Sequence, residues 1–365
     1  FELLDINKYV DMAIQYSRGC PFQCEFCDVT LMLGRKVRTK SPGQVIAELS
    51  KLYDLGWRRL VFFVDDNFIG NIHQTKLLLK ELVPWMQSRG MPFNFSTQAS
   101  VNMANDPVLL EQMFKAGFFR VFLGIETPDK ESLKEARKYQ NAGIDLVSAC
   151  RKISSAGFQV IAGTILGFDN EKPEAGKRLI EFANQTNIPE IFATLLQAGP
   201  GTDMWNRLES QGRLLNADFD TISNQTALIN FIPTRPLEEI VSEFVELYQI
   251  LYAPKNFLKR AYEHYSGMNP PKVKKSFKLP YFMELRAALI AIFRNGFVYD
   301  SRLDFWSYFL RAIWLFPDRL DRFVTALVVA EHYYECRQSL IANLASRREA
   351  LTEEEKSLSC VGKSP

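Results

Sequence analysis

The chain has 365 residues, of which 47% are hydrophobic and 24% are charged, and its formal net charge is +2. These proportions are typical of a globular protein and exclude disordered, collagen-like and disulfide-scaffold chains. Because the net charge is so small, the composition predicts no binding to nucleic acid. No uncharged apolar run reaches the ~18–20 residues of a membrane helix, and no secretion signal opens the chain, so we expect a cytoplasmic protein.

Apolar runs of strand length alternate with helix-like stretches as far as about residue 200. The runs predict strands at 13–16, 60–64, 93–97, 121–125, 160–166 and 191–196. The stretches between them predict helices at 43–55, 72–88, 107–116, 130–138, 143–155 and 173–186. Such alternation is typical of parallel strands joined by right-handed crossovers. We therefore expect an α/β fold whose six units form a partial (β/α) barrel, short of the eight units of a closed one.

The pattern changes after Pro200, where strand-like runs fade and helical periodicity dominates. Helices are predicted near 203–212, 236–252, 281–295, 303–314 and 318–345, with prolines between them. These changes predict a barrel domain over 1–205, a mostly helical C-terminal domain over 206–350 and a frayed polar tail over 351–365.

The helical half is rich in aromatic residues, with 14 Phe, Trp or Tyr side chains between residues 281 and 334. These side chains either pack in a helical core or line a pocket for a large apolar substrate. In the second case we expect the helical half to close the mouth of the barrel. A basic run precedes the aromatic segment; such a run is usually a solvated loop, and the alternative is peripheral contact with an anionic membrane surface. The run consists of Lys272, Lys274, Lys275 and Lys278.

Three of the six cysteines, Cys20, Cys24 and Cys27, follow the first predicted strand with the spacing C-x3-C-x2-C. Active sites of (β/α) barrels lie at this end of the strands. Thiolates are the usual ligands of iron–sulfur clusters, and three thiolates on a four-iron cluster leave one iron open for a reactive ligand. Structural zinc normally takes four protein ligands, often from two C-x2-C halves, and only one half is present. The spacing therefore favours a reactive iron–sulfur site, with zinc as the alternative.

Carboxylates close two of the other predicted strands. Asp65 and Asp66 follow the second strand, where they could accept hydrogen bonds from a bound ammonium or ribose, or instead lie in a solvated loop or cap a helix. Glu126 ends the apolar fourth strand. A buried carboxylate there costs several kcal/mol unless it is paired, so Glu126 is a candidate cofactor-site residue.

The cysteine spacing, with Phe26 directly before the last cysteine, resembles the core motif of radical S-adenosylmethionine (SAM) enzymes. The resemblance implies a [4Fe–4S] cluster on Cys20, Cys24 and Cys27, with its open iron chelated by the amino and carboxylate groups of SAM. One electron, supplied by a donor such as flavodoxin or ferredoxin, would then cleave SAM to methionine and a 5′-deoxyadenosyl radical. The fold of that family is a partial six-unit barrel, which agrees with the alternation described above.

Other positions extend the same resemblance. Many radical SAM enzymes have Gly-Gly-Glu after the second strand, in contact with the methionine amino group, and this chain departs from that pattern. In the family a glutamate after the fourth strand commonly lies near SAM, and a G-x-I-x-G pattern on the fifth strand lays its backbone against the adenine. The cofactor-binding residues that the resemblance implies are Phe26, Asp65, Asp66, Glu126, Gly163, Ile165 and Gly167.

Four segments narrow the resemblance to the cobalamin-binding subgroup, which includes hopanoid and bacteriochlorophyll methylases; they are residues 16–20, 40–42, 64–71 and 124–128. Members usually carry an N-terminal cobalamin-binding domain that is missing here. Either this chain, which starts with Phe, is a piece of a longer protein that supplies cobalamin, or it works without that domain. The resemblance implies methylation of an unactivated carbon in an apolar, lipid- or tetrapyrrole-like substrate. Radical rearrangement, ring closure or oxidation is the alternative reaction, and a non-catalytic iron–sulfur or zinc module is the alternative class.

Overall fold

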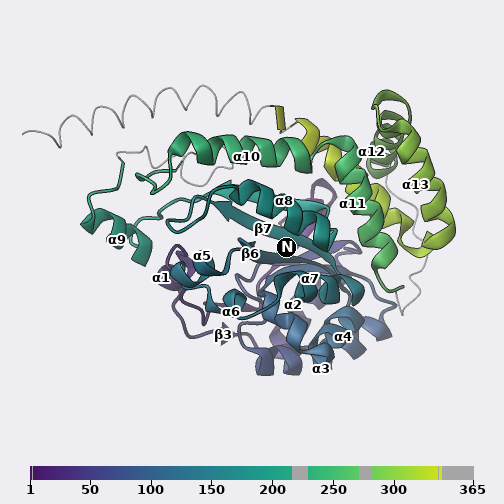
Figure 1. Cartoon of the computed structure of the whole chain (residues 1–365). Helices are drawn as coiled ribbons and strands as arrows, with labels where there is room; N and C mark the ends of the chain where they lie inside the picture. The colour runs from purple at the N-terminus through teal and green to yellow at the C-terminus, as the bar shows by residue number, and fades with distance from the viewer. Residues whose placement is uncertain (2, 216–228, 271–281, 336, 339–365) are drawn as a thin grey trace, which may run out of the picture.

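Six parallel strands form the sheet at the centre of the molecule (Figure 1). The computed structural model describes residues 1, 3–215, 229–270, 282–335 and 337–338. The strands are adjacent in chain order: β1 (Asp11–Ile14), β4 (Leu60–Phe63), β5 (Asn94–Ala99), β6 (Phe118–Glu126), β7 (Gln159–Leu166) and β8 (Glu190–Leu195). Each adjacent pair is parallel, and β1 and β8 stand at the two ends of the order. This is the open barrel that the sequence predicts, and all six predicted strands are confirmed.

Helices return the chain from each strand to the next, as parallel pairing requires. They are α2 (Pro42–Asp54), α3 (Ile72–Ser88), α4 (Pro107–Ala116), α5 (Lys130–Glu135), α6 (Tyr139–Ala142), α7 (Leu146–Ser155) and α8 (Ala175–Thr186). Local sequence fixes where several of them begin. Ser41 and Gln44 form a capping box at the start of α2. The helix predicted from residue 143 begins only at Leu146, because the Asp145 side chain caps it.

Two short elements that the sequence analysis did not predict frame the cysteine segment. One is the antiparallel pair β2 (Ser17–Arg18) and β3 (Arg38–Thr39), and the other is α1 (Val29–Leu33). Elements of two to five residues are too short to leave a periodic signal in the sequence. Gly19 follows β2 with φ +94°, and a Cβ at this position would lie 2.7 Å from the carbonyl oxygen of Gly34. Only glycine therefore lets the chain turn from β2 into the cysteine segment.

Side chains alternate between the helix-facing side of the strands and the inside of the barrel. On the helix-facing side, Phe63, Phe95 and Phe118 are fully buried, and their ring centroids lie 5.1–5.2 Å apart. On the inner side, Phe62 and Phe122 are only half-buried. The packed core of this half thus lies between sheet and helices, and the inside of the barrel is not closed by the strands themselves.

The C-terminal region is helical, as predicted. Its described elements are α9 (Asp203–Ser210), α10 (Leu237–Leu251), α11 (Pro254–Gly267), α12 (Phe282–Phe293), a π-helical segment (Arg294–Val298), α13 (Arg302–Leu315) and a helix over 320–335. The sequence analysis missed α11. The predicted helix over 318–345 and the predicted tail over 351–365 extend beyond the described residues. Among the helices that the structure describes, none has the length and apolar character to cross a membrane.

Helix α10 covers the edge strand β8. The Tyr252 hydroxyl donates to the carbonyl oxygen of Ile191 at 2.6 Å and accepts from the amide of the same residue at 3.0 Å. The Tyr248 hydroxyl donates to the carbonyl oxygen of Ala193 at 2.8 Å. An edge strand leaves such backbone groups unpaired, so the two tyrosines replace part of a missing neighbouring strand.

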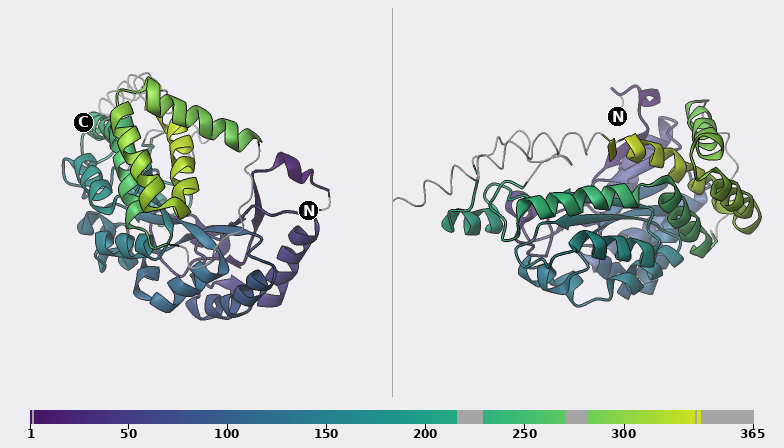
Figure 2. Two further views of the ribbon diagram at one scale, coloured as in Figure 1. Left: turned by 90° about the vertical axis from the view of Figure 1, so that its right-hand side faces the viewer. Right: turned by 45° about the horizontal axis from the view of Figure 1, so that its top comes forward.

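Helices α11, α12 and α13 lie at the amino end of the barrel strands, away from the cysteine segment (Figures 1 and 2). The Arg260 side chain of α11 donates to the carbonyl oxygen of Ile188 at 3.2 Å, and Arg322 donates to that of Gly157 at 3.2 Å. Ile188 and Gly157 lie two residues before the starts of β8 and β7, and α13 packs on α11 through stacked Tyr262 and Tyr308 rings. The expectation that the aromatic helices close the barrel mouth is therefore wrong for the described residues, because α11 and α13 attach at the opposite end.

Candidate active site

The three clustered cysteines lie in the loop between β2 and α1, at the carboxyl end of the barrel. Cys20, Cys24 and Cys27 are free thiols, and each is half-buried. Burial raises the pKa of Cys27 to about 12, with smaller contributions in the same direction from Cys24 and Cys20. The three thiols are therefore near neighbours in space as well as in sequence. A metal that binds them must displace the thiol protons.

Backbone hydrogen bonds from other parts of the chain hold this loop. The Glu25 amide donates to the carbonyl oxygen of Ala136 at 3.1 Å, and the Met204 amide donates to the carbonyl oxygen of Glu25 at 3.0 Å. At the start of the loop, the Cys20 amide donates to the carbonyl oxygen of Gly34 at 3.3 Å. The loop is thus fixed by α1, by the end of α5 and by α9, which belongs to the C-terminal region.

Two side-chain amides point at the cysteine sulfurs. Asn67 Nδ2 lies 4.0 Å from Cys20 Sγ, and Gln140 Nε2 lies 3.5 Å from Cys24 Sγ. Hydrogen bonds of this kind tune the potential of an iron–sulfur cluster, so the donor set suits such a cluster. In the described part of the chain, no three His, Cys, Asp or Glu side chains converge as for a single metal ion. A cluster has no such requirement, since each thiolate binds a different iron.

The two aspartates after β4 have different surroundings. Asp65 is fully buried; its Oδ2 accepts from the Tyr16 amide at 3.0 Å, and its Oδ1 accepts from the Ser17 hydroxyl at 2.5 Å and from the Ser17 amide. Burial outweighs these bonds and raises the pKa of Asp65 to about 6. Asp65 therefore positions the chain that leads into the cysteine loop, while its contact with a cofactor stays a prediction.

Asp66 offers the free carboxylate that Asp65 lacks. Its Oδ2 atom is buried and has no hydrogen-bond partner among the described residues. Burial raises the pKa of Asp66, and the charge of Asp28, the residue after Cys27, raises it further. A buried carboxylate oxygen without a partner is costly, so this atom suits a bound donor such as an ammonium group.

Glu126 ends β6 with a positive φ of 63°, and its carboxylate is paired with the ammonium group of Lys138. Both side chains are 10% exposed. A Cβ on Gly124 would lie 2.6 Å from Glu126 Oε1 and 2.7 Å from Lys138 Nζ, so a side chain there would displace the charged ends of this pair. Burial lowers the pKa of Lys138, but Glu126 and the thiols of Cys24 and Cys27 outweigh burial and raise it overall. Lys138 thus brings a buried positive charge to the cysteine loop.

The glycine–isoleucine pattern of β7 follows the inside of the barrel. A Cβ on Gly163 would lie 2.6 Å from the ring of Phe122, and a Cβ on Gly167, which has φ +104°, would lie 2.7 Å from Ile229. Both glycines are therefore required by protein atoms, a reason that the sequence analysis did not anticipate. Ile165 between them is half-buried, and contact of this segment with an adenine stays a prediction.

Phe26 connects the cysteine loop with the end of β7. Its ring packs edge-on against Phe168 with 6.1 Å between the centroids. Phe168 directly follows Gly167, so two of the motifs singled out in the sequence meet at this contact. The carboxyl ends of β4, β6 and β7 share one edge of the sheet, which places the remaining candidates around the same loop.

Comparison with known proteins identifies the barrel. Residues 14–183 match the Radical SAM superfamily model. This part of the chain is a radical SAM domain. The family uses a [4Fe–4S] cluster and SAM, and the resemblance inferred from the cysteine motif is confirmed. Residues 202–346 match a second model, described only as a domain of unknown function, DUF4070.

Relatives of the whole chain are named as methyltransferases. An uncharacterised methyltransferase of Synechocystis sp. is 47% identical over 338 residues, covering 93% of this chain and 63% of that protein. The hopanoid C-2 methylase of Rhodopseudomonas palustris is 36% identical, covering 91% of this chain and 62% of that protein. The chain thus spans less than two thirds of these relatives. The fold is similar to that of TsrM from Kitasatospora setae, a radical SAM methyltransferase solved with cobalamin and [4Fe–4S] cluster bound (TM-score 0.56, 15% identity, 89% of this chain and 61% of that one).

A chain of ion pairs joins the radical SAM domain to α9. Arg207 Nη2 lies 2.6 Å from Glu25 Oε1, and Arg207 Nη1 lies 2.8 Å from Asp169 Oδ2. Asp169 also binds Arg213 at 2.5 Å. Glu25 stands between two of the cysteines, so Arg207 connects the cysteine loop, the loop after β7 and the C-terminal region. Its partner Glu25 is 182 residues away, and no sequence pattern predicts a contact over that separation.

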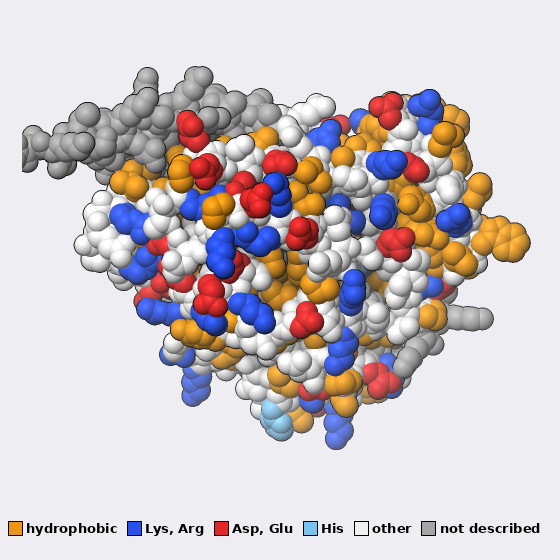
Figure 3. Space-filling view, viewed as in Figure 1, with side chains coloured by type: hydrophobic (Ala, Val, Ile, Leu, Met, Phe, Trp, Pro, Cys, Tyr) orange, Lys and Arg blue, Asp and Glu red, His pale blue; other side chains and the backbone are white. Residues whose placement is uncertain are grey.

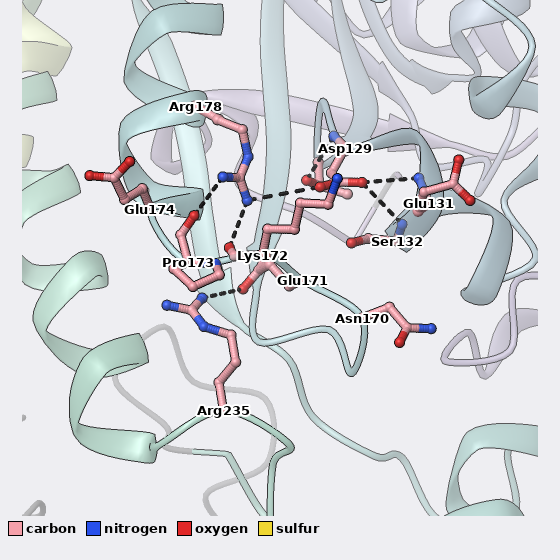
Figure 4. Close-up of polar contacts among 12 residues, drawn as sticks. Asp129, Glu131, Ser132, Asn170, Glu171, Lys172, Pro173, Glu174, Arg178 and Arg235 are labelled. Carbon is pink, nitrogen blue, oxygen red and sulfur yellow. Dashed lines mark hydrogen bonds and ion pairs between the residues drawn. The ribbon is translucent and has the colours of Figure 1, made fainter.

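A second polar network braces the loop that follows β7 in the radical SAM domain (Figure 4). Glu171 Oε2 accepts from the Gly167 amide at 2.9 Å and lies 3.2 Å from Arg235 Nη1. Arg178 donates to the carbonyl oxygens of residues 172 and 173 and approaches Asp129 at 3.8 Å. Burial raises the pKa of Glu171 to about 7. The end of the glycine–isoleucine segment is therefore held by residues that lie outside the motif itself.

Proposed function

We propose that this chain is the catalytic part of a radical SAM methyltransferase that methylates an unactivated carbon of an apolar, lipid- or tetrapyrrole-like substrate. The observation that carries the proposal is the group of three half-buried thiols at the carboxyl end of the barrel, where Asp66 also has an Oδ2 atom without a partner among the described residues. When bound, the cluster supplies the electron that cleaves SAM to methionine and a 5′-deoxyadenosyl radical. A radical reaction without methyl transfer is the alternative outcome at the same site.

The chain's own residues would divide the work of binding. Cys20, Cys24 and Cys27 would hold three irons and leave the fourth open. The Oδ2 atom of Asp66 would accept a hydrogen bond from the amino group of SAM, which satisfies a buried carboxylate oxygen that has no partner among the described residues. Lys138, held by Glu126, would place a positive charge beside the anionic thiolates and lower the cost of gathering them.

The inside of the barrel favours an apolar substrate. Phe62, Phe122, Ile165 and Phe192 are half-buried on the inner side of four different strands. These side chains have apolar surface left to cover, and a large apolar molecule would cover it. The relationship to a hopanoid C-2 methylase points to the same substrate class.

Two further components would complete the reaction. An electron donor such as flavodoxin or ferredoxin would supply the electron to the cluster. Cobalamin would carry the methyl group if the chain works together with a cobalamin-binding domain, as the likeness to the cobalamin-binding subgroup implies.

The test is anaerobic reconstitution with iron and sulfide, followed by reduction in the presence of SAM. We expect about four irons per chain and formation of 5′-deoxyadenosine. Cys20→Ala, Cys24→Ala and Cys27→Ala should each abolish both. Cys150→Ala is the matched control, because Cys150 is a fully buried core thiol on α7 and should leave both unchanged.

Two results would overturn the proposal at different levels. Uptake of zinc but not iron would exclude an iron–sulfur cluster. A full cluster without SAM cleavage would mean that the chain is a non-catalytic iron–sulfur binding module. Methyl transfer to a lipid or tetrapyrrole that depends on added cobalamin supports methylation. SAM cleavage with a rearranged or oxidised product in its place would assign the alternative reaction.

A further inference from the structure

The segment around β2 and β3 carries a group of exposed positive charges beside the cysteine loop. We call this group the basic patch; it consists of Arg18, Arg35, Lys36 and Arg38, whose side chains are all exposed. Figure 3 shows Lys and Arg side chains projecting at the lower left of the molecule, where Figure 1 draws α1 and β3. None of the four cations forms an ion pair with an Asp or Glu of the described residues.

The basic patch lies directly against the cysteine loop. The carbonyl oxygen of Gly34 accepts from the Cys20 amide at 3.3 Å, so the backbone next to Arg35 holds the first cysteine. The guanidinium group of Arg35 lies within hydrogen-bond distance of the side-chain amide group of Gln23. Gln23 is exposed and stands between Cys20 and Cys24. A molecule bound to the basic patch would therefore lie on the outer side of the loop, close to the thiols.

The charges of the patch repel one another. Arg18 and Arg38 are directly opposite in the antiparallel pair of β2 and β3, an arrangement of like charges that destabilises a sheet. Between residues 29 and 47 the sequence has four Lys or Arg residues and no Asp or Glu, although the whole chain has a net charge of only +2. The nearby exposed Asp28 lies close enough to Asp66 to raise its pKa and forms no ion pair with the patch. Mutually repelling cations at a surface favour an anionic partner.

The position of the patch favours one kind of anionic partner. A cluster on the three grouped cysteines needs an electron from outside, because the other cysteines, at 150, 336 and 360, are scattered and form no second motif for a relay cluster. Proteins that exchange electrons meet through small surfaces, and four cations are enough to steer such an encounter. A nucleic acid normally requires a larger excess of positive charge than this chain carries.

We propose that the basic patch is the docking surface for an acidic electron-transfer protein of the flavodoxin or ferredoxin type. The docked donor would lose one electron and the cluster would gain it, while no bond forms or breaks and no proton moves at this surface. The proposal rests on the proposed function, because it needs the cluster, and it adds the residues that receive the donor. Opposite charges would raise the rate of encounter more than the lifetime of the complex.

The first test is calorimetric binding of a flavodoxin with a net negative charge to the reconstituted protein in the absence of SAM. We expect binding that weakens as the salt concentration rises. Arg18→Glu with Lys36→Glu should weaken it roughly tenfold or more, because two attractive charges become repulsive. Lys51→Glu with Lys80→Glu is the matched control, since it makes the same change of charge at exposed positions on α2 and α3, outside the patch. The control should bind flavodoxin nearly as the wild type does.

The second test compares two reductants in SAM cleavage. Dithionite is small and needs no docking surface, so with dithionite the Arg18→Glu, Lys36→Glu variant should cleave SAM as the wild type does. With reduced flavodoxin the same variant should need roughly tenfold more donor to reach the same rate. Its iron content and melting temperature should match the wild type, because Glu at position 18 would face Arg38 with the opposite charge.

Several outcomes would overturn the proposal. They are no flavodoxin binding by the wild type, binding that salt does not weaken, and equal binding by the patch variant and its control. Binding of phosphatidylglycerol vesicles or RNA that only the patch variant loses, with flavodoxin binding unchanged, would assign the patch to that partner instead. Loss of cleavage with both reductants in the patch variant alone would mean that the patch only shapes the cysteine loop. Absence of cleavage with dithionite in every protein would count against the proposed function, and the binding test would still be decided separately.

Discussion

The two ends of the barrel differ in what they bury and what they expose. At the carboxyl end, charged groups such as Glu126 and Lys138 are enclosed, paired and turned toward the cysteine loop. At the amino end, aromatic rings such as Tyr262 and Tyr308 stack 4.6 Å apart, and Trp314 is left 87% exposed. Enclosed, paired charges can hold a reacting group in one position, whereas the attraction between apolar surfaces has no preferred direction. The comparison therefore separates the carboxyl end around the cysteine loop, which we call the chemical end, from an apolar and partly exposed amino end, and substitutions at one end should not change the properties measured at the other.

The largest effect on stability is expected from breaking the buried pair at the chemical end. Glu126→Gln leaves the Lys138 ammonium buried without its partner, which should lower the free energy of unfolding by about 3–5 kcal/mol. The double variant Glu126→Gln with Lys138→Met should recover much of that loss, because no unpaired charge remains. SAM binding, followed by calorimetry on the reconstituted protein, should stay weak in both variants. Normal SAM binding in either would assign the pair to structure alone.

A somewhat smaller effect is expected from Arg207, which joins the cysteine loop to α9. Arg207→Ala removes the charged hydrogen bonds to Glu25 and Asp169 and should lower the free energy of unfolding by about 2–3 kcal/mol. Iron should also be lost faster to a chelator, since the loop is held less firmly. Arg137→Ala is the control: Arg137 forms an exposed ion pair with Asp203 in the same region, and exposed pairs contribute little. Equal rates of iron loss in the two variants would contradict the role given to Arg207.

At the amino end, substitution of two tryptophans should affect stability differently. Trp306 is half-buried, donates from Nε1 to the carbonyl oxygen of Gly296 at 2.9 Å and contacts Phe297 and Phe309. Trp306→Ala should lower the free energy of unfolding by about 2–3 kcal/mol, below the range for a fully buried Trp. Trp314→Ala should leave the melting temperature nearly unchanged. Both should keep wild-type SAM cleavage in the reconstituted protein, and a selective loss of cleavage in either would end the separation of the two ends.

The smallest expected effect is a dependence of stability on pH at Glu171. Burial raises the pKa of Glu171 in the folded protein to about 7, so the folded state holds the proton more tightly than the unfolded state. The resulting stabilisation is present at low pH and is lost as the pH rises from about 4.5 to about 7. Glu171→Gln keeps an acceptor for the Gly167 amide but does not titrate. Between about pH 5 and about pH 8 the variant should gain about 2 kcal/mol relative to the wild type, because the pKa of Glu171 stays raised even though Arg235 lowers it.

Urea unfolding at several pH values measures this gain. The control is Glu174→Gln, at an exposed position three residues further on, which should run parallel to the wild type. A parallel curve for Glu171→Gln as well would mean that Glu171 is ionised throughout, held by Arg235.

The parts of the molecule that the sequence predicted are those set by local pattern. Strand length and strand–helix alternation predicted the barrel, and C-x3-C-x2-C predicted the cysteine loop, because both depend on residues close together in the chain. The contacts of Gln140 with Cys24 and of Arg207 with Glu25 span 116 and 182 residues and left no local trace. Gly163 was singled out for a ligand, yet the ring of Phe122 from the neighbouring strand already requires glycine there.

The sequence predicted that the C-terminal region is helical, but it did not predict the end of the barrel to which the helices attach. Its helices follow from periodicity, whereas the end of the barrel to which they attach depends on contacts such as that of Arg260 with Ile188. This hydrogen bond joins α11 to the segment before β8, 72 residues earlier in the chain, and no sequence spacing predicts such a contact. The short elements around the cysteines were missed for the opposite reason, since they contain too few residues to repeat.

The tyrosines of α10 make the two edges of the open barrel unequal. Because hydroxyl groups of Tyr248 and Tyr252 occupy backbone sites on β8, another strand can pair there only after α10 has moved away. The two tyrosine side chains thereby protect this edge against strand exchange and aggregation. Either side chain can be substituted without the other. Because side chains make these bonds, a substitution of Tyr248 or Tyr252 would change the cover of this edge without changing the register of the sheet.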